Sequence, residues 1–318
     1  MMNTSQARLG LNPILTALFL GLAQGNLTAK ELFPELPMAM RGMTVPRMGT
    51  ERLQKYDLAR APGADTRRVD IHWDGVTYSV VQKAVDIPIP RENIDEASTL
   101  NNMFNVSANL DMSKTALMTA QSILELDYEL DAAAIATLPA SFAAGNVLAL
   151  AGATKWSAAT GTPLGDLDNA MGVVRQKVGR NPNILHLSAV AFQALKRNPQ
   201  VLNSMSVTAS KVLTPELLAT LLGIKKVVVG DAVWQNGTGV ISDVWGNNAI
   251  LAFAPEIGAN GMDLGQPGFG TTNILKDHPK VETPWYDHEA KTWVYGVTYE
   301  RAPQIAYNGA GFLFQNPF

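Results

Sequence analysis

One long helix is the sequence feature that most constrains the fold. Between Asn105 and Leu138, apolar side chains recur at steps of three and four residues, and Pro139 ends the pattern. At 1.5 Å per residue such a helix is about 50 Å long, well beyond the three or four turns usual in globular proteins. Because no heptad continues cleanly, we expect a helix that crosses a domain, not a coiled coil. The positions of the pattern are Val106, Leu110, Leu117, Ala120, Leu124, Tyr128, Ile135 and Leu138.

The chain before this helix is punctuated by residues that interrupt regular structure. Residues 26–66 contain Pro34, Pro37, Gly42, Pro46 and Gly49. Such a segment cannot bury itself and usually lies over another part of the structure. The apolar run Leu9–Gly25 is too short and too broken to cross a bilayer as a stable helix. A signal-peptide core is the alternative, but we expect a short arm helix that packs on its own or a neighbouring subunit.

Residues 67–81 carry the pattern of a β-hairpin. Apolar side chains alternate up to Trp73, Asp74-Gly75 offers a tight turn, and alternation resumes from Val76 to Val80. A lone two-stranded hairpin is marginal in water, so this one needs a surface to pack on.

The middle of the chain reads as a mixed α/β unit over residues 163–255. Two helices begin at a Thr-Pro pair, Thr162-Pro163 and Thr214-Pro215, and end before Gly179 and Gly223. Each is followed by an apolar run typical of a buried strand, "NILHL" and "IKKVVVG". We expect further hairpins around "WQNGTG" and "WGNNA", and closing strands that alternate through Trp293, Tyr295, Val297 and Tyr299.

The strand-to-helix junction at His186 and Ser188 resembles a catalytic corner only superficially. A nucleophile elbow needs small residues two before and two after the serine, whereas His186 and Val190 occupy those positions. Ser188 directly precedes the predicted helix "AVAFQALKR", at the N-cap position, where serine is favoured. We therefore expect both residues to be part of the scaffold.

No other group of residues predicts catalysis, a cofactor or a metal site. Asp277-His278 and Asp287-His288 lack the spacing that points two ligands the same way, so both histidines are expected in surface loops. The glycine-rich segment Gly265–Gly270 has no Lys-Ser/Thr partner and is expected to be an ordinary loop. The absence of cysteine excludes disulfides, thiolate catalysis and cysteine ligands.

Charge is scarce and unevenly placed. Charged residues make up 17% of the 318-residue chain, against about 25% in an average soluble domain, which suggests surface covered by partners. A net charge of −3 argues against binding nucleic acid through a strongly basic surface. Residues 41–90 carry eight basic and six acidic residues (net +2), and residues 91–138 carry two and eight (net −6).

This asymmetry suggests that the hairpin of one copy attracts the long helix of another. The residues predicted to make that contact are Arg67, Arg68 and Trp73 on the hairpin, and Glu125, Asp127 and Glu129 on the helix. The alternative is that the acidic side chains only solvate the outer face of the helix.

The order of these segments resembles the major capsid proteins of tailed bacteriophages, whose fold is shared with encapsulins. Two stretches, "RNPNILHLSAVAFQALKRNPQVLNSM" and "LTPELLATLLGIKKVVVGDAVW", are similar to the axial domain of such proteins. The resemblance covers about residues 40–318 and implies an α+β fold. Its expected parts are an N-terminal arm (1–40), an E-loop with its hairpin (41–90), a peripheral domain (91–181) with a spine helix at about 105–138, an α/β axial domain (182–255) and returning strands (256–318).

The resemblance also implies a function. We expect a structural virion subunit that forms pentamers and hexamers of an icosahedral shell, assembled in the host cytoplasm around double-stranded DNA that it contacts non-specifically. A portal protein would be a partner, and the lack of a long leading segment implies a separate scaffolding protein. The alternatives are an encapsulin-like compartment, disfavoured by the long segment before the spine helix, and an α/β hydrolase or metal enzyme.

Overall fold

The computed structural model describes most of the chain. The described residues are 27–48, 55–63, 65–69, 73–95, 112–205, 212–255, 257–258, 261–262 and 268–318. The predicted arm helix Leu9–Gly25 and the first part of the predicted long helix lie outside these residues.

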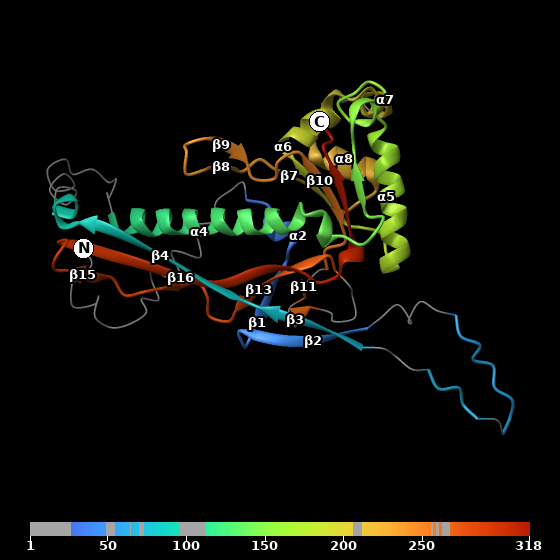
Figure 1. Cartoon of the computed structure of the whole chain (residues 1–318), viewed down its shortest axis with the longest axis horizontal. Helices are drawn as coiled ribbons and strands as arrows, with labels where there is room; N and C mark the ends of the chain where they lie inside the picture. The colour runs from blue at the N-terminus through green and yellow to red at the C-terminus, as the bar shows by residue number, and fades with distance from the viewer. Residues whose placement is uncertain are drawn as a thin grey trace.

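The long helix is α4, Met112–Ala136, and it lies along a large sheet (Figure 1). Its 25 residues span about 37 Å. Leu117, Ala120 and Leu124 pack against Val297 and Tyr299 of that sheet, as the three- and four-residue spacing predicts. The predicted helix is therefore confirmed over its described part.

The sheet beneath α4 has six strands, and β16 is its central strand. β16 pairs antiparallel with β4 over ten residues, from Thr292 opposite Pro90 to Arg301 opposite Val81. From Val294 to Arg301 every residue of β16 is buried. Helix α4 packs on one face of the strand, and Arg41, His278 and Glu282 contact its Glu300 and Thr298 side chains. The strands are β1 (Glu35–Met38), β4 (Val81–Pro90), β13 (Gly270–Leu275), β14 (Lys280–Val281), β15 (Trp285–Asp287) and β16 (Thr292–Ile305).

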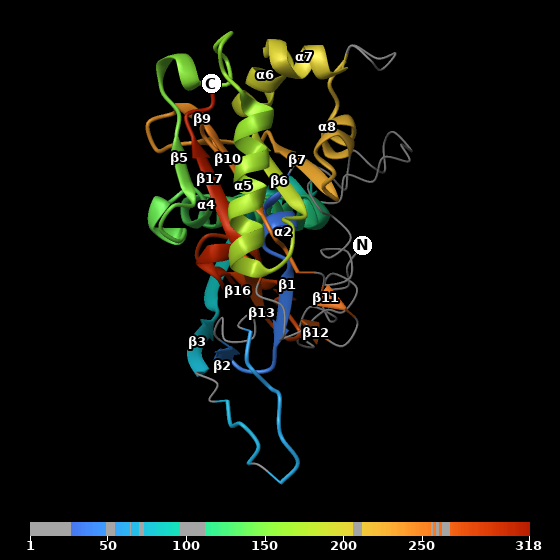
Figure 2. The same cartoon turned by 90° about the vertical axis from the view of Figure 1, so that its right-hand side faces the viewer.

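A second sheet of five strands forms the core of the predicted α/β unit. Its order is β5 (Val147–Ala149), β17 (Gly311–Gln315), β10 (Asn248–Ala252), β6 (Ile184–Ser188) and β7 (Lys226–Gly230). The helices around it are α5 (Pro163–Val178), α6 (Ala189–Arg197), α7 (Pro199–Met205) and α8 (Pro215–Leu222). Figure 2 shows α5 lying across β10 and β17. Because β5 and β17 come from outside residues 163–255, this unit is larger than its pattern indicated; the division into domains remains a prediction.

The predicted helix ends are confirmed in detail. Gly179 and Gly223 have left-handed backbones, with φ of 81° and 65°, which terminate α5 and α8. Thr214 Oγ1 accepts a hydrogen bond from Leu217 N at 3.3 Å, whereas Thr162 makes no side-chain cap. Ser188 Oγ accepts one from Ala191 N at 3.2 Å and is fully buried, so its predicted role as an N-cap is confirmed.

The predicted turn at Asp74-Gly75 is wrong. Both residues lie inside strand β3 (Trp73–Ser79), which pairs antiparallel with β2 (Gly42–Met48), so that Gly75 stands opposite Pro46. Glycine at this position allows the two strands to approach closely, since a Cβ on Gly75 would come within 2.9 Å of Thr44 Cγ2. The strand that pairs with β3 lies about 30 residues earlier in the chain, and a local pattern cannot reveal it.

One of the two later hairpins is confirmed. β8 (Val233–Gln235) pairs with β9 (Ile241–Asp243) through "WQNGTG". Around "WGNNA" no hairpin forms, because β10 pairs with β6 and β17 of the buried sheet instead of with β9. The remaining elements are α2 (Ala29–Leu32), helical residues 91–95, β11 (Ile257–Gly258), β12 (Gly261–Met262) and three 3-10 turns, Pro139–Ser141, Gly152–Thr154 and Asn308–Ala310. Within the described ranges, no helix is long and apolar enough to span a bilayer.

Candidate assembly surfaces

A loop that extends away from the body of the molecule is the most exposed part of the described chain. Residues 55–63 and 65–69 continue outward from the β2–β3 ribbon (Figures 1 and 2). All of them are exposed except Tyr56, which is partly buried, and Leu58 is 70% exposed. The Arg67 guanidinium lies 5.9 Å from the centre of the Tyr56 ring and 3.5 Å from the Asp57 carbonyl, so its contacts stay within the loop.

The base of the ribbon is fixed by an ion pair. Arg41 donates from Nε and Nη2 to the two carboxylate oxygens of Glu300, at 2.7 and 2.8 Å. The Glu300 side chain is only 4% exposed, and these hydrogen bonds lower its pKa. Two-point binding by a planar guanidinium sets an orientation as well as a distance. Hydrogen bonds from Asn273 Nδ2 to the Ser79 carbonyl at 3.3 Å and from Gln304 Nε2 to the Thr77 carbonyl at 2.5 Å act with Arg41 to fix the root of the ribbon on the large sheet.

His278 lies beside this pair and corrects one sequence prediction. It was expected in a surface loop, but its side chain is 1% exposed, with Nε2 3.6 Å from Glu300 Oε1. Burial lowers its pKa, and the Glu300 charge opposes that effect. The prediction failed because a turn after β13 folds back onto β16. His288 is exposed in a turn, as predicted.

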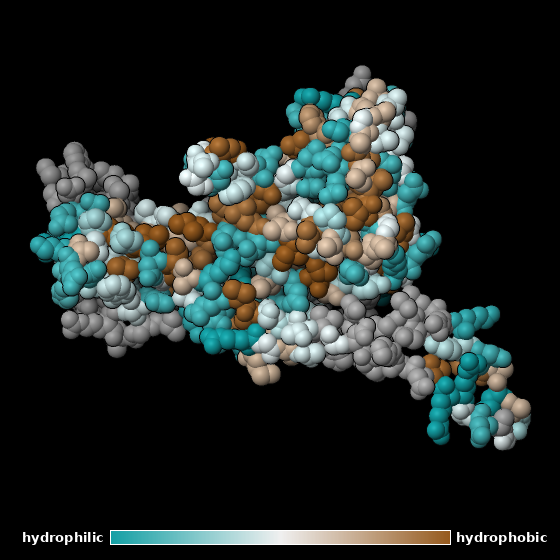
Figure 3. Space-filling model, in the orientation of Figure 1, coloured by the Kyte–Doolittle hydropathy of each residue, from teal (hydrophilic) through white to brown (hydrophobic). Residues whose placement is uncertain are grey.

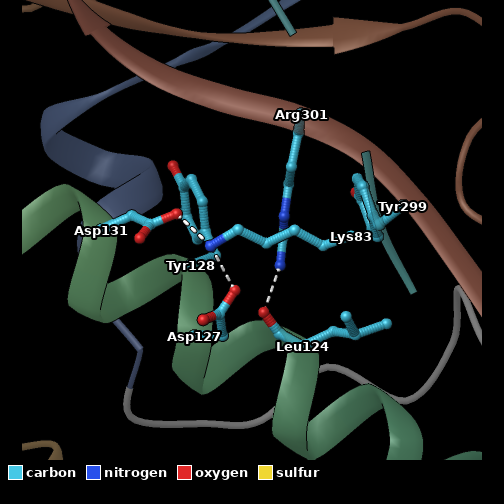
Figure 4. A pocket seen from close by; sticks show the side chains of 7 residues that line it. All are labelled: Lys83, Leu124, Asp127, Tyr128, Asp131, Tyr299 and Arg301. Atoms are coloured by element: carbon cyan, nitrogen blue, oxygen red, sulfur yellow. Dashed lines mark hydrogen bonds and ion pairs between the residues drawn. The ribbon is translucent and has the colours of Figure 1, made fainter. Parts of the chain in front are cut away.

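The acidic residues of α4 separate onto different faces of the helix. Asp127 and Asp131, four residues apart, both accept hydrogen bonds from Lys83 of β4, at 2.6 and 2.5 Å (Figure 4). Partial burial lowers the pKa of Lys83, but the hydrogen bonds to both carboxylates outweigh it, so the net change is upward. Lys83 lines a small pocket between α4 and the sheet, together with Asp127, Asp131 and residues described below (Figure 4).

Glu125 pairs with Arg301 inside the molecule. Arg301 Nη1 donates to Glu125 Oε1 at 2.9 Å, and Nη2 donates to the Leu124 carbonyl at 2.8 Å. The guanidinium lies between the rings of Tyr128 and Tyr299, 4.2 and 4.0 Å from their centres (Figure 4). Both charged groups are buried, so this pair fixes α4 on the sheet.

Glu129 is fully buried and joins three parts of the chain. Its carboxylate accepts hydrogen bonds from Thr28 N and Ala29 N, both at 2.9 Å, and from Trp245 Nε1 at 2.7 Å. Thr28 Oγ1 also donates to it, at 3.0 Å, and lies 2.8 Å from His186 Nε2. Burial lowers the pKa of His186 to about 3, so the neutral ring packs against Trp245, with centroids 3.9 Å apart. The Thr28–His186 contact is therefore structural: its histidine is a poor base and is shut off from solvent.

These positions revise the predicted contact residues. Glu125 and Glu129 are 6% and 0% exposed and bind groups of their own chain, so predicting them as contacts to a neighbour was wrong. The alternative, that the acidic side chains only solvate the outer face of the helix, fails for Glu125 and Glu129 for the same reason, whereas Asp127 and Asp131 are partly exposed and bind Lys83. Arg67 and Arg68 are exposed, Asp127 is partly exposed, and Trp73 lies in β3. For these four residues contact with another copy remains a prediction.

The buried polar contacts of α4 are hard to predict from the local sequence. Glu129 lies near the buried apolar residues Tyr128, Ala132 and Ala133, and a carboxylate in such a setting needs buried donors. The sequence therefore could have indicated that Glu129 is buried. The residues that bind it, Thr28 and Trp245, could not have been found, because they lie about one hundred residues before and after it in the chain. Among the described residues, no cluster of three His, Asp or Glu side chains could hold a metal ion.

Comparison with known sequences gives two clear relatives, although no family model matches. The chain is 27% identical over 277 residues to the major capsid protein of Burkholderia phage BcepMu, covering 86% of each chain. It is 25% identical over 283 residues to the major capsid protein of Pseudomonas phage JBD67, covering 83% of this chain and 84% of that protein.

Comparison with solved structures agrees. A phage-related protein from Bordetella bronchiseptica RB50 superposes with a TM-score of 0.78 at 31% identity, covering 96% of this chain and 97% of the other. The SrpI encapsulin of Synechococcus elongatus superposes with a TM-score of 0.54 at 11% identity, covering 93% and 90%. At that identity the encapsulin shares the fold and nothing further is implied.

Proposed function

The chain belongs to the phage major capsid protein family, and we propose that it builds an icosahedral head from pentamers and hexamers of itself. The observation that best supports this proposal is the loop formed by residues 55–63 and 65–69, in which every residue is exposed except the partly buried Tyr56. An exposed segment of this length gains stability only when a partner covers it. In a shell of identical copies, that partner is the neighbouring subunit.

The ribbon offers a direct test of this role. Met48 and Trp73 are register partners in adjacent strands, so residues 49–72 can be replaced by the two-residue turn Asn-Gly without disturbing β2 or β3. We expect the shortened protein to fold, with an unchanged circular dichroism spectrum, but to form no closed shells in negative-stain electron microscopy. The unaltered chain, with or without its scaffolding protein, should give capsomers or shells.

Two results would contradict the proposal. Shells of normal size and yield from the shortened chain would show that the loop is dispensable for assembly. A full-length chain that stays a stable monomer and binds a small ligand would favour the enzyme alternative, which has no catalytic constellation among the described residues to support it.

The proposed contents of the shell are double-stranded DNA, held through non-specific contacts. A net charge of −3 suits a container that a separate motor fills, because a strongly basic wall would bind the incoming DNA tightly. A portal protein and a separate scaffolding protein complete the proposed partners, with assembly in the host cytoplasm. Co-expression with each candidate scaffold, scored by particle yield and uniformity, tests that part.

The encapsulin-like alternative differs in what the shell encloses. Particles purified from an infected or induced host should contain nuclease-protected double-stranded DNA if this chain forms a phage head. Particles with a defined protein cargo and no protected DNA would favour the compartment instead. The curated relatives favour the phage head, because both are named major capsid proteins of phages.

A further inference from the structure

The root of the β2–β3 ribbon contains a buried histidine that lies beside the same acceptor atom as Arg41. His278 Nε2 is 3.6 Å from Glu300 Oε1, the oxygen that accepts a hydrogen bond from Arg41 Nη2 at 2.8 Å. The side chains of His278 and Glu300 are 1% and 4% exposed. Among the described residues, neither ring nitrogen of His278 has a hydrogen-bond partner of good geometry. Buried polar atoms are normally paired, so this ring is an exception that lies directly beside a carboxylate.

The charged groups near the ring come from β16, from β14 and from the residue before β2. Burial has the largest effect on the pKa of His278 and lowers it below the ordinary 6.5, and the charges of Lys280 and Arg41 act in the same direction. Glu300 and the backbone of Thr298 favour the charged ring. The hydrogen bonds from Arg41 lower the pKa of Glu300, so this carboxylate stays ionised while the histidine takes up a proton.

The two cations that would then meet at Glu300 differ in their access to water. The Arg41 side chain is 71% exposed, so its guanidinium can leave the carboxylate and become hydrated. A protonated His278 is buried and cannot do so, and a buried charge needs a partner. The two positive charges also repel each other across one carboxylate. The exposed arginine is therefore the group that gives way.

We propose that protonation of His278 weakens the pairing of Arg41 with Glu300 and so loosens the root of the ribbon. With a neutral ring, Arg41 holds both carboxylate oxygens. With a charged ring, Nε2 donates to Oε1 and competes with the guanidinium. Because the pKa of His278 lies below 6.5, the change takes place on the acidic side of that value.

The position of the root makes a small change there large at the far end. In Figure 3 the loop of residues 55–63 and 65–69 stands apart from the body of the molecule, so a change of angle at the root moves the whole loop. Hydrogen bonds from Asn273 and Gln304 to β3 involve no titratable group and keep the ribbon attached. All of these contacts lie within one subunit, so the inference does not depend on the proposed shell.

Hydrogen exchange of the unassembled full-length subunit measures the opening of the root. The Val80 amide donates to the Arg41 carbonyl at 3.1 Å, and the first register pair of the ribbon is Gly42 with Ser79. Exchange is compared at about pH 7.5 and about pH 5, after correction for its intrinsic dependence on pH. At the lower pH, the amides of β3 and Val80 should lose severalfold more protection than those of β10 and β17, which report any general loss of stability.

Two variants assign the effect to the proposed groups. His278→Phe keeps a ring at the buried position that takes up no proton, and it should abolish the additional loss of protection at low pH. Arg41→Gln removes the pair and should give fast exchange at the root at both pH values. His72→Gln and His288→Gln are the controls, because they remove other histidines and should keep the response of the unaltered chain.

The proposal fails if the root amides of the unaltered chain only follow the amides of β10 and β17 between the two pH values. It also fails if His278→Phe retains the full response. Should His278→Phe not fold, Arg41→Gln decides: a response of the original size in that variant would overturn the proposal, because the proposed effect acts through Arg41.

Discussion

At the scale of single residues, stability depends on buried charges that are completely paired. Glu129 has four donors around its carboxylate, and Arg301 has a carboxylate, a carbonyl and two aromatic rings around its guanidinium. Removing one member leaves its partners buried without hydrogen bonds, which costs about 1–3 kcal/mol for each group. These residues should therefore tolerate substitution far less than the exposed charges of the same helix.

Glu129→Ala should lower the free energy of unfolding by about 3 kcal/mol or more, because Thr28 N, Ala29 N and Trp245 Nε1 lose their acceptor. Asp127→Ala, on the same helix, is the control: it breaks a half-exposed pair with Lys83 and should cost at most about 1 kcal/mol. Urea denaturation of the unassembled subunit measures both. Equal losses would show that the Glu129 network contributes no special stability.

His186 should make stability depend on pH. In the unfolded chain its pKa is near the ordinary 6.5, whereas burial lowers the native pKa to about 3. Between these values the unfolded state binds the extra proton, so stability falls as pH falls, by about 1.4 kcal/mol per pH unit. His186→Gln should reduce this slope between about pH 5.5 and 3.5. His278, whose pKa burial also lowers, should preserve part of it.

The control for this measurement is His288→Gln, because His288 is exposed in a turn. Its unfolding curves at each pH should match those of the unaltered chain. A His186→Gln protein with the original slope would mean that other groups carry the acid sensitivity.

At the scale of elements, two helices with the same Thr-Pro start differ in how they are capped. Thr214 accepts a hydrogen bond from Leu217 N, whereas Thr162 is exposed and makes no such bond. Thr214→Ala should therefore cost about 1 kcal/mol, and Thr162→Ala only a few tenths. Thermal denaturation of the two variants in parallel checks this difference. Comparable losses would show that the backbone preference of threonine, not the hydrogen bond, is what matters.

Prediction from sequence succeeded where the signal is local. The packing of Leu117, Ala120 and Leu124 follows from helical spacing, and the ends of α5 and α8 follow from Gly179 and Gly223. It failed where partners are remote in the chain. Asp74-Gly75 has the composition of a turn, but pairing with β2 keeps it extended. The burial of Glu125 and Glu129 depends on residues 28, 245 and 301, which no local pattern connects to the helix.

At the scale of the whole molecule, the projecting loop should act through charge as well as shape. Arg67→Glu with Arg68→Glu should impair shell assembly while leaving the isolated subunit folded, because both side chains are exposed and distant from the core. Arg175→Glu with Arg197→Glu, exposed on α5 and α6, is the charge-matched control. Particle yield in electron microscopy and the melting temperature of the subunit measure the two effects. Normal assembly of the loop variant would refute an electrostatic role for these arginines.

The ten-residue pairing of β16 with β4, clamped beneath α4, has a mechanical consequence. β16 and α4 are joined by the Arg301–Glu125 pair, and β4 is joined to α4 by Lys83, so these three elements together resist bending along the helix axis. By contrast, the ribbon of β2 and β3 is only two strands wide, and it is held at its root by Arg41 and by hydrogen bonds from Asn273 and Gln304 to carbonyls of β3. When an assembly of these subunits changes size, we expect α4, β4 and β16 to rotate together as a rigid unit. We expect the accompanying change of shape to be concentrated in the β2–β3 ribbons.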